Sequence, residues 1–247
     1  MNPLILLFFL VTFGSLITSV TGLGGGTLIL AGLLLIYPPE LALPLHSFTQ
    51  LAANGLRAGI FWKNVRWKVV FAYASLMLPM AWLAALLFDH INSSFLKVLV
   101  GLFIMASIFP WKFRVESEPS LKTFSLIGAV SGFLAIFVGA VGPMVTPFFN
   151  RIKIERQGNL STKSAGQFFL QFSKIIAFSG AAGINFVTIK EHVGILMLGS
   201  FIGVGISIPI SKKISDQKFE FMVNILLGLI ALKVTVEGCR ELWLLYS

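Results

Sequence analysis

The stretch Thr21-Gly22-Leu23-Gly24-Gly25-Gly26-Thr27 interrupts the first long apolar run of the chain, residues 4–37. A continuous helix of that length would measure about 50 Å, whereas the hydrocarbon core of a bilayer is about 30 Å thick. Glycine also weakens a helix because it loses more backbone freedom on folding than any other residue. The run therefore predicts two half-helices that meet at a non-helical turn.

A second break of the same kind follows 117 residues later. The apolar run 121–149 contains Gly139-Ala140-Val141-Gly142-Pro143, and an offset of 117 places Gly22 on Gly139 and Gly25 on Gly142. The same offset aligns three polar pairs, which are Ser47 with Ser164, Gln50 with Gln167 and Arg57 with Lys174. This pattern predicts a duplication, with a first membrane repeat at 1–115 and a second at 116–247. Chance matching of leucine-rich sequence is the alternative, but it does not readily align two breaks with three polar positions.

The composition indicates the environment in which these repeats fold. Hydrophobic residues make up 56% of the chain, charged residues only 12%, and the mean hydropathy is +0.89. So much apolar surface exceeds what one soluble core can bury. The apolar runs are continuous rather than alternating, which favours helices over barrel strands. We therefore expect an all-α integral membrane protein that crosses the lipid bilayer of the cell (inner or plasma) membrane several times. Six more apolar stretches are expected at 41–61, 68–88, 94–110, 164–180, 192–210 and 219–236.

The loop charges favour one topology. The formal net charge of +9 arises between the apolar runs, as in loops at an anionic cytoplasmic face, so no nucleic-acid partner is predicted. If both broken runs are hairpins that enter and leave on one face, 13 of the 19 basic residues share a side, namely Lys63, Arg66, Lys68, Lys112, Arg114, Lys122, Arg151, Lys153, Arg156, Lys163, Lys212, Lys213 and Lys218. Each half then holds a broken or re-entrant helical hairpin followed by three transmembrane helices. Because three is odd, the two repeats are expected to be inverted.

The breaks also predict a binding site. A half-helix N-terminus presents unpaired N–H groups and the positive end of a helix dipole, which together attract an anion. The second half-helices are expected to begin at Thr27 and Met144, so two such ends would face each other near the centre of the protein. Close helix packing is the alternative role for these glycines.

Two buried cations point to the same chemistry. Arg57 and Lys174 lie inside apolar stretches, where a charge costs about 2.5–3.5 kcal/mol. The ten acidic residues lie almost entirely in loops or near stretch ends, so an anionic substrate could serve as the counter-ion. Alternatively, Arg57 could extend its side chain toward the Lys63 side of the membrane. His46 is a weaker candidate, either as a proton site or as an interfacial residue.

Polar side chains recur at helical spacing around both cations. They either line a pathway or make hydrogen bonds between helices. The full predicted substrate-binding set is Gly22, Gly24, Gly25, Gly26, Thr27, Ser47, Gln50, Asn54, Arg57, Gly139, Gly142, Pro143, Met144, Ser164, Gln167, Gln171 and Lys174. No cofactor and no metal site is predicted, because the chain has neither a phosphate-binding G-x-x-x-x-G-K-[ST] loop nor a cluster with metal-ligand spacing.

The motif Thr21-Gly22-Leu23-Gly24-Gly25-Gly26, followed by a helix bearing Ser and Gln and repeated after about 120 residues, resembles the sulfite exporter TauE/SafE family. The resemblance extends over nearly the whole chain. It implies a membrane permease for sulfite, sulfonates or related small sulfur-containing anions, and not an enzyme. An interior-negative potential drives anions outward with about 2.3 kcal/mol per charge per 100 mV, which favours export by alternating access. An anion channel or a non-transporting membrane scaffold is the alternative, whereas an intramembrane enzyme would need a nucleophile and base that are not visible.

Overall fold

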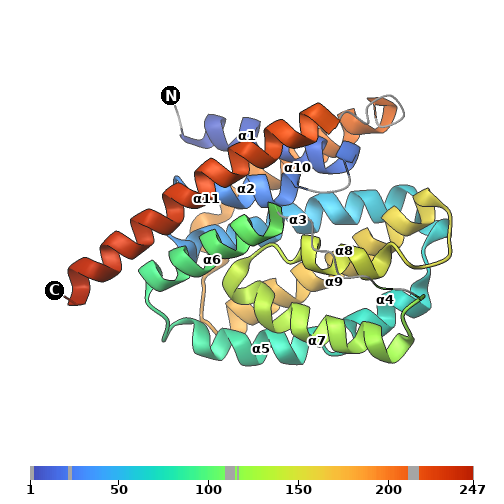
Figure 1. The fold of residues 1–247 in the computed structure, drawn as a ribbon, viewed down its shortest axis with the longest axis horizontal. Coiled ribbons are helices and arrows are strands. Elements are labelled where there is room, and N and C mark those ends of the chain that lie inside the picture. Colours follow the sequence, from blue (N-terminus) through green and yellow to red (C-terminus); the bar gives the residue numbers. More distant parts are fainter. Residues whose placement is uncertain (1–2, 22–23, 109–114, 116, 211–216, 247) are drawn as a thin grey trace.

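The computed structural model describes residues 3–21, 24–108, 115, 117–210 and 217–246. This part of the chain is almost entirely helical and contains no strand, which confirms the all-α prediction (Figure 1). The predicted site residue Gly22 lies outside the described residues. The expected repeat boundary lies between residue 115, which is described, and residue 116, which is not.

In the described residues of the first half there are six α-helices and one 3₁₀ turn, Trp62–Asn64. The helices are α1 (Pro3–Thr21), α2 (Gly25–Leu34), α3 (Pro39–Ile60), α4 (Trp67–Ala74), α5 (Met77–Phe88) and α6 (Ser93–Ile108). The second half contains the helices α7 (Leu121–Val138), α8 (Gly142–Phe149), α9 (Arg156–Gly180), α10 (Lys190–Ile210) and α11 (Gln217–Tyr246), with a 3₁₀ turn at Phe186–Ile189.

The helix boundaries repeat at the offset read from the sequence. The last residues of α1 and α7, the first residues of α2 and α8, and the first residues of α3 and α9 are each 117 positions apart. In the fourth position of each half, the first half has α4 and α5, separated at Ser75-Leu76, whereas the second half has the single helix α10. The order of elements is otherwise the same in the two halves.

Each broken run forms a hairpin with arms of unequal length. Gly14 of α1 packs against Ile29 and Gly32 of α2 packs against Leu10, so α1 and α2 run antiparallel. At 1.5 Å per residue, α1 is about 28 Å long and α2 about 15 Å. The second hairpin also has unequal arms, because α7 has 18 residues and α8 has 8, and Phe124 near the start of α7 packs on Phe149 at the end of α8 with ring centroids 5.2 Å apart. The prediction of two half-helices was therefore wrong for the first arms, which are nearly full-length, and correct for the short second arms.

The helices pack across the two halves in Figure 1. α3 and α9 lie side by side at the centre and run antiparallel, since Gly55 contacts Phe168 and Asn64 approaches Gly158. α6 and α11 are also antiparallel, with Gly238 of α11 against Ser94 of α6. α1 packs on α10 from the other half, just as α7 packs on α4 and α5.

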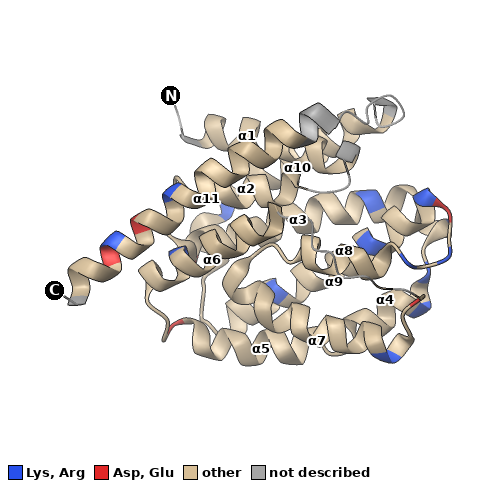
Figure 2. Ribbon diagram, viewed as in Figure 1, with Lys and Arg blue, Asp and Glu red and all other residues tan. Residues whose placement is uncertain are grey.

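Each hairpin begins and ends at one end of the molecule. The backbone N–H of Arg66 donates to Thr162 Oγ1 over 3.0 Å, and its guanidinium forms an ion pair with Glu118, so the chain before α7 and the start of α9 meet at the same end. At the opposite end, Tyr37 packs on His192 with ring centroids 5.8 Å apart. Figure 2 shows most Lys and Arg residues at the end where α3 finishes and α9 begins.

Four described segments are long and apolar enough to cross a membrane, which are Trp67–Phe88, Leu121–Val138, Phe186–Ile208 and Phe221–Leu245. α3 and α9 are long enough but not apolar enough, although both were expected to cross. Their polar stripes lower the mean hydropathy and lie buried between the helices. A helix enclosed by other helices does not need lipid-facing hydrophobicity along its whole surface.

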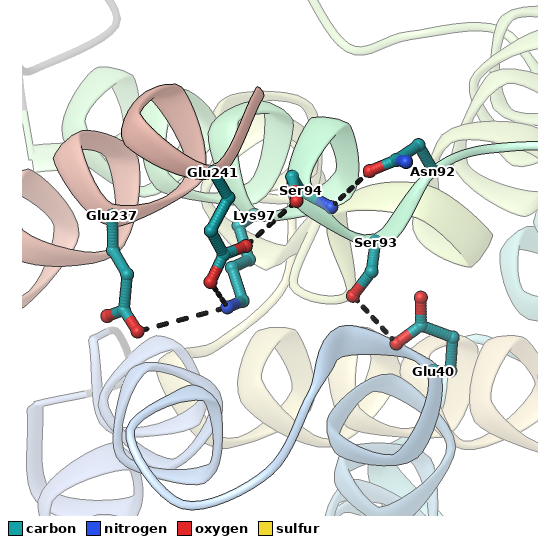
Figure 3. A network of polar contacts seen from close by, with 7 residues as sticks. All are labelled: Glu40, Asn92, Ser93, Ser94, Lys97, Glu237 and Glu241. Atoms are coloured by element: carbon teal, nitrogen blue, oxygen red, sulfur yellow. Dashed lines mark hydrogen bonds and ion pairs between the residues drawn. The ribbon is translucent and has the colours of Figure 1, made fainter. Parts of the chain in front are cut away.

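A polar network joins α6, α11 and the start of α3 (Figure 3). Lys97 Nζ lies 2.5 Å from Glu241 and 3.9 Å from Glu237, and Ser94 donates to Glu241 over 2.8 Å. Next to it, Ser93 donates to Glu40 over 3.0 Å. We call the contacts of Lys97 with Glu237 and Glu241 the α6–α11 clasp.

The hairpin topology makes a labelling prediction. In a Cys239→Ser background, cysteines replacing Asn64 and Lys153 should react with a membrane-impermeant maleimide from the same side of the membrane. Asp89→Cys is the control and should react from the opposite side. Labelling of residues 64 and 153 from different sides would contradict the topology.

Removing the α6–α11 clasp should loosen the packing of these helices. Lys97→Met leaves two carboxylates without their cation, so we expect the free energy of unfolding to fall by about 1–2 kcal/mol. Thermal unfolding in detergent measures this change. Lys233→Met is the matched control, because Lys233 is exposed on α11 and has no ion pair with any described residue. Equal melting temperatures for both variants would show that the clasp does not contribute.

Candidate functional site

A cavity of about 70 Å³ lies where the two hairpin tips meet α3 and α9. A single water takes up roughly 10–15 Å³ of such a cavity, so this one can hold a guest of a few heavy atoms. It is much smaller than drug-sized sites, which begin at roughly 300 Å³. The hairpins contribute Thr18, Gly24, Gly26, Thr27, Ala140, Gly142, Pro143 and Thr146. The central helices contribute His46, Gln50, Asn54, Arg57, Lys163, Ser164, Gln167 and Gln171.

The helix N-termini at the tips start earlier than the sequence predicted. α2 begins at Gly25 and α8 at Gly142, two residues before Thr27 and Met144, and neither N-cap has a side-chain hydrogen bond. The amide of Met144 donates to Val141 O over 3.1 Å, and Pro143 has no N–H to offer. The tip of α8 therefore presents fewer backbone donors than that of α2.

Two basic side chains satisfy backbone carbonyls at the tips. Lys174 Nζ donates to Gly139 O over 3.1 Å, and His46 Nε2 lies 3.0 Å from Gly26 O. Because a carbonyl oxygen only accepts, the histidine nitrogen must be the donor. Lys174 is fully buried and does not line the cavity, so its charge supports the second hairpin rather than facing a guest.

Arg57 differs from Lys174 because its donors are not saturated. Its Nη1 donates to Asn54 Oδ1 over 3.3 Å, which orients the guanidinium along α3. Nε and Nη2 are buried without a hydrogen-bond partner among the described residues, although Arg57 is only 6% exposed. No Asp or Glu is found among the described residues that line the cavity. Buried charges normally have partners, so these two donors are available for an anionic guest.

Four other buried polar atoms on the central helices have no partner among the described residues, namely His46 Nδ1, Gln50 Nε2, Ser164 Oγ and Gln171 Oε1. All four belong to residues that line the cavity. Gln167 is different because its Nε2 lies 3.3 Å from Tyr73 Oη. The cavity thus combines unpaired donors with unpaired acceptors.

The structure brings together eleven residues of the predicted set around this cavity. They are Gly24, Gly26, Thr27, Gln50, Asn54, Arg57, Gly142, Pro143, Ser164, Gln167 and Gln171. Five other members do not line it, which are Gly25, Ser47, Gly139, Met144 and Lys174. Gly25 packs closely against Thr18 of α1, and the Ser47 hydroxyl donates to Leu43 O within α3 over 3.0 Å.

Lys163 is the main residue that the sequence interpretation missed, because it was counted among the basic loop residues. It lies in α9 and lines the cavity. The offset of 117 pairs Lys163 with His46, and this relationship was the available signal. Thr18, Ala140 and Thr146 also line the cavity, but as small residues of apolar runs they had no distinguishing sequence feature.

The family model for the sulfite exporter TauE/SafE matches residues 7–234. The chain belongs to the sulfite exporter TauE/SafE family. This is a family of membrane transporters, so the four apolar spans are those of a multi-pass membrane protein. No curated protein and no solved structure matches the chain.

The turn at Gly139 makes a stability prediction for this TauE/SafE member. Gly139 has φ of +75°, and a Cβ there would lie 2.6 Å from Leu30 Cδ2 and 2.8 Å from Leu43 Cδ2. Gly139→Ala should lower the free energy of unfolding by about 1–3 kcal/mol, as thermal unfolding would show. Gly194→Ala is the control, because open space surrounds Gly194 within α10 and alanine favours helix by about 0.5–1 kcal/mol. A Gly139→Ala protein as stable as the control would contradict the assigned turn.

Proposed function

We propose that this protein exports a small sulfur-containing anion, such as sulfite or a sulfonate, across the cell membrane by alternating access. The observation that carries the proposal is Arg57, which is buried, faces the cavity and has two donors without partners among the described residues. A charge placed in this way is costly unless an opposite charge joins it. A tetrahedral or pyramidal oxyanion offers several oxygens that a guanidinium can bind in pairs.

The other cavity residues support the same guest. Gln50 Nε2 and the start of α2 supply uncharged donors, and no described carboxylate of the cavity lining would repel an anion. The volume of about 70 Å³ suits a small oxyanion rather than a nucleotide or peptide. We assign the substrate contacts to Arg57, Gln50, Asn54 and Ser164, together with Gly26, Thr27 and Gly142 at the tips. Lys174 then has an indirect role, because it supports the second hairpin through its hydrogen bond to Gly139 O.

Alternating access requires two halves that can move relative to a fixed site. We propose that the halves 1–115 and 116–247 are inverted repeats of a single membrane domain. Supporting this, α3 and its repeat counterpart α9 run antiparallel, as do α6 and α11. In transporters with inverted repeats the substrate lies near the bilayer midplane between discontinuous helices, and here the cavity lies between two hairpin breaks.

The transport proposal predicts a specific loss in Arg57→Gln. Truncating one partner of a buried charge pair costs about 2 kcal/mol or more, so the affinity for sulfite or methanesulfonate should fall about 30-fold or more. Calorimetry in detergent measures binding, and export from proteoliposomes with an imposed interior-negative potential measures flux. Arg66→Gln is the matched control, because Arg66 forms its ion pair with Glu118 away from the cavity and should bind within about twofold of the wild type.

Three outcomes would contradict the proposal. Wild-type binding and flux in Arg57→Gln would remove the basis of the site. Flux that does not saturate with anion concentration, and that shows no exchange across the membrane, would indicate an anion channel. A wild-type protein that neither binds nor moves any small sulfur oxyanion would indicate a scaffold.

A further inference from the structure

The cavity contains acceptors as well as donors, and the acceptors have no role in holding a simple oxyanion. His46 is 1% exposed and Gln171 is 3% exposed, and both line the cavity. His46 Nδ1 and Gln171 Oε1 are buried without a hydrogen-bond partner among the described residues. A buried polar atom is normally paired, so each of these atoms is a candidate contact for a guest.

The contact of His46 with the hairpin fixes the chemistry of its free nitrogen. Nε2 lies 3.0 Å from Gly26 O and must carry the hydrogen, because the carbonyl has none to give. In the neutral ring Nδ1 then has only its lone pair and is an acceptor. Gln171 Oε1 is an amide carbonyl oxygen, which carries no hydrogen and can only accept. The two atoms come from different helices, α3 and α9.

The cavity residues of α3 and α9 lie at different distances from the basic end. α3 and α9 are antiparallel with Gly55 against Phe168, so Arg57 and Ser164 lie on corresponding turns near the basic end. Gln50 and Gln171 lie about two turns further along, and His46 lies a turn beyond Gln50. The backbone of Arg57 therefore lies nearer the basic end, and the residues that carry the two buried acceptors, His46 and Gln171, lie further from it together with Gln50.

We infer that the anion carried by this protein bears its own N–H or O–H donor, with its charged oxygens toward Arg57 and its donor toward His46 and Gln171. This inference rests on the proposed function and narrows its substrate class. Hydrogen sulfite, hydroxyalkanesulfonates and amino- or amido-sulfonates have this chemistry. A fully deprotonated oxyanion or an alkanesulfonate would satisfy Arg57 and leave both acceptors buried and unpaired, which is the kind of penalty that gives polar sites their selectivity.

Two pairs of nearly isosteric monoanions test the inference at different lengths. Sulfamate and methanesulfonate differ by an amino group in place of a methyl group. Isethionate (2-hydroxyethanesulfonate) and 1-propanesulfonate differ by a hydroxyl in place of a methyl group. With the full-length protein in detergent and calorimetry as the readout, the donor-bearing member of at least one pair should bind about tenfold more tightly, which corresponds to one net hydrogen bond.

Matched variants separate the acceptors from the rest of the site. Gln171→Met keeps the length of the side chain and removes the acceptor, and His46→Leu removes the ring lone pair together with the N–H that reaches Gly26 O. Each should reduce the preference for the donor-bearing anion by at least about threefold. Gln50→Met is the control, because Gln50 presents an unpaired donor, so its loss should weaken both members of a pair alike and leave the preference intact.

The outcomes distinguish this inference from the proposed function. Equal binding within both pairs, with affinity that still depends on Arg57, would overturn the inference and leave the anion site in place. A preference that survives in both Gln171→Met and His46→Leu would also overturn it. Failure of all four anions to bind the wild-type protein would overturn the proposed function, and the inference with it. Far-ultraviolet circular dichroism and size-exclusion elution of each variant exclude misfolding as the cause of a loss.

Discussion

The whole arrangement depends on one constraint, which is that an interrupted helix inside a membrane must find partners for its freed backbone groups. Two such interruptions separate α1 from α2 and α7 from α8, and a basic side chain from a central helix reaches the backbone beside each one. Lys174 donates to Gly139 O at the end of α7, and His46 donates to Gly26 O in the first turn of α2. These contacts hold the hairpin tips against α3 and α9. The polar stripes of α3 and α9 consequently stay between helices and away from lipid, and the cavity forms at the point where the tips end.

Residues of the two halves can be paired by sequence position, but the paired side chains make different contacts. The offset of 117 pairs Arg57 with Lys174 and His46 with Lys163. Lys174 donates to Gly139 O and does not line the cavity, whereas Arg57 lines it. In the second pair His46 contacts Gly26 O, and both His46 and Lys163 line the cavity. The cavity is therefore lined by Arg57 but not by its repeat counterpart Lys174, and it holds the unpaired acceptors of His46 and Gln171 as well. A duplicated fold thereby provides an asymmetric environment for a guest that is itself asymmetric.

Much of this could be predicted from sequence, because membranes impose strong rules on composition and length. The glycine breaks, the offset of 117 and the polar stripes follow from local pattern alone, and the family resemblance proved correct. The contacts of individual side chains in the folded protein could not be predicted. Whether Lys174 faces a guest or a carbonyl depends on where the turn at Gly139 ends, and that turn is positioned by Leu30 and Leu43 from the other half. Lys163 resembled a loop cation because hydropathy does not reveal that α9 begins at Arg156.

Under the proposed function, the two unpaired donors of Arg57 would couple binding to movement. A cavity closed around Arg57 alone retains a buried charge with two unpaired donors, and this state is costly in a low-dielectric interior. Hydration of the guanidinium in an open state, or an anion in a closed state, removes the cost. A ligand shifts a conformational equilibrium only by its differential affinity for the two states, and here the difference arises at Arg57. The same residue that selects the charge of the guest would thus favour closure when the site is filled and opening when it is empty.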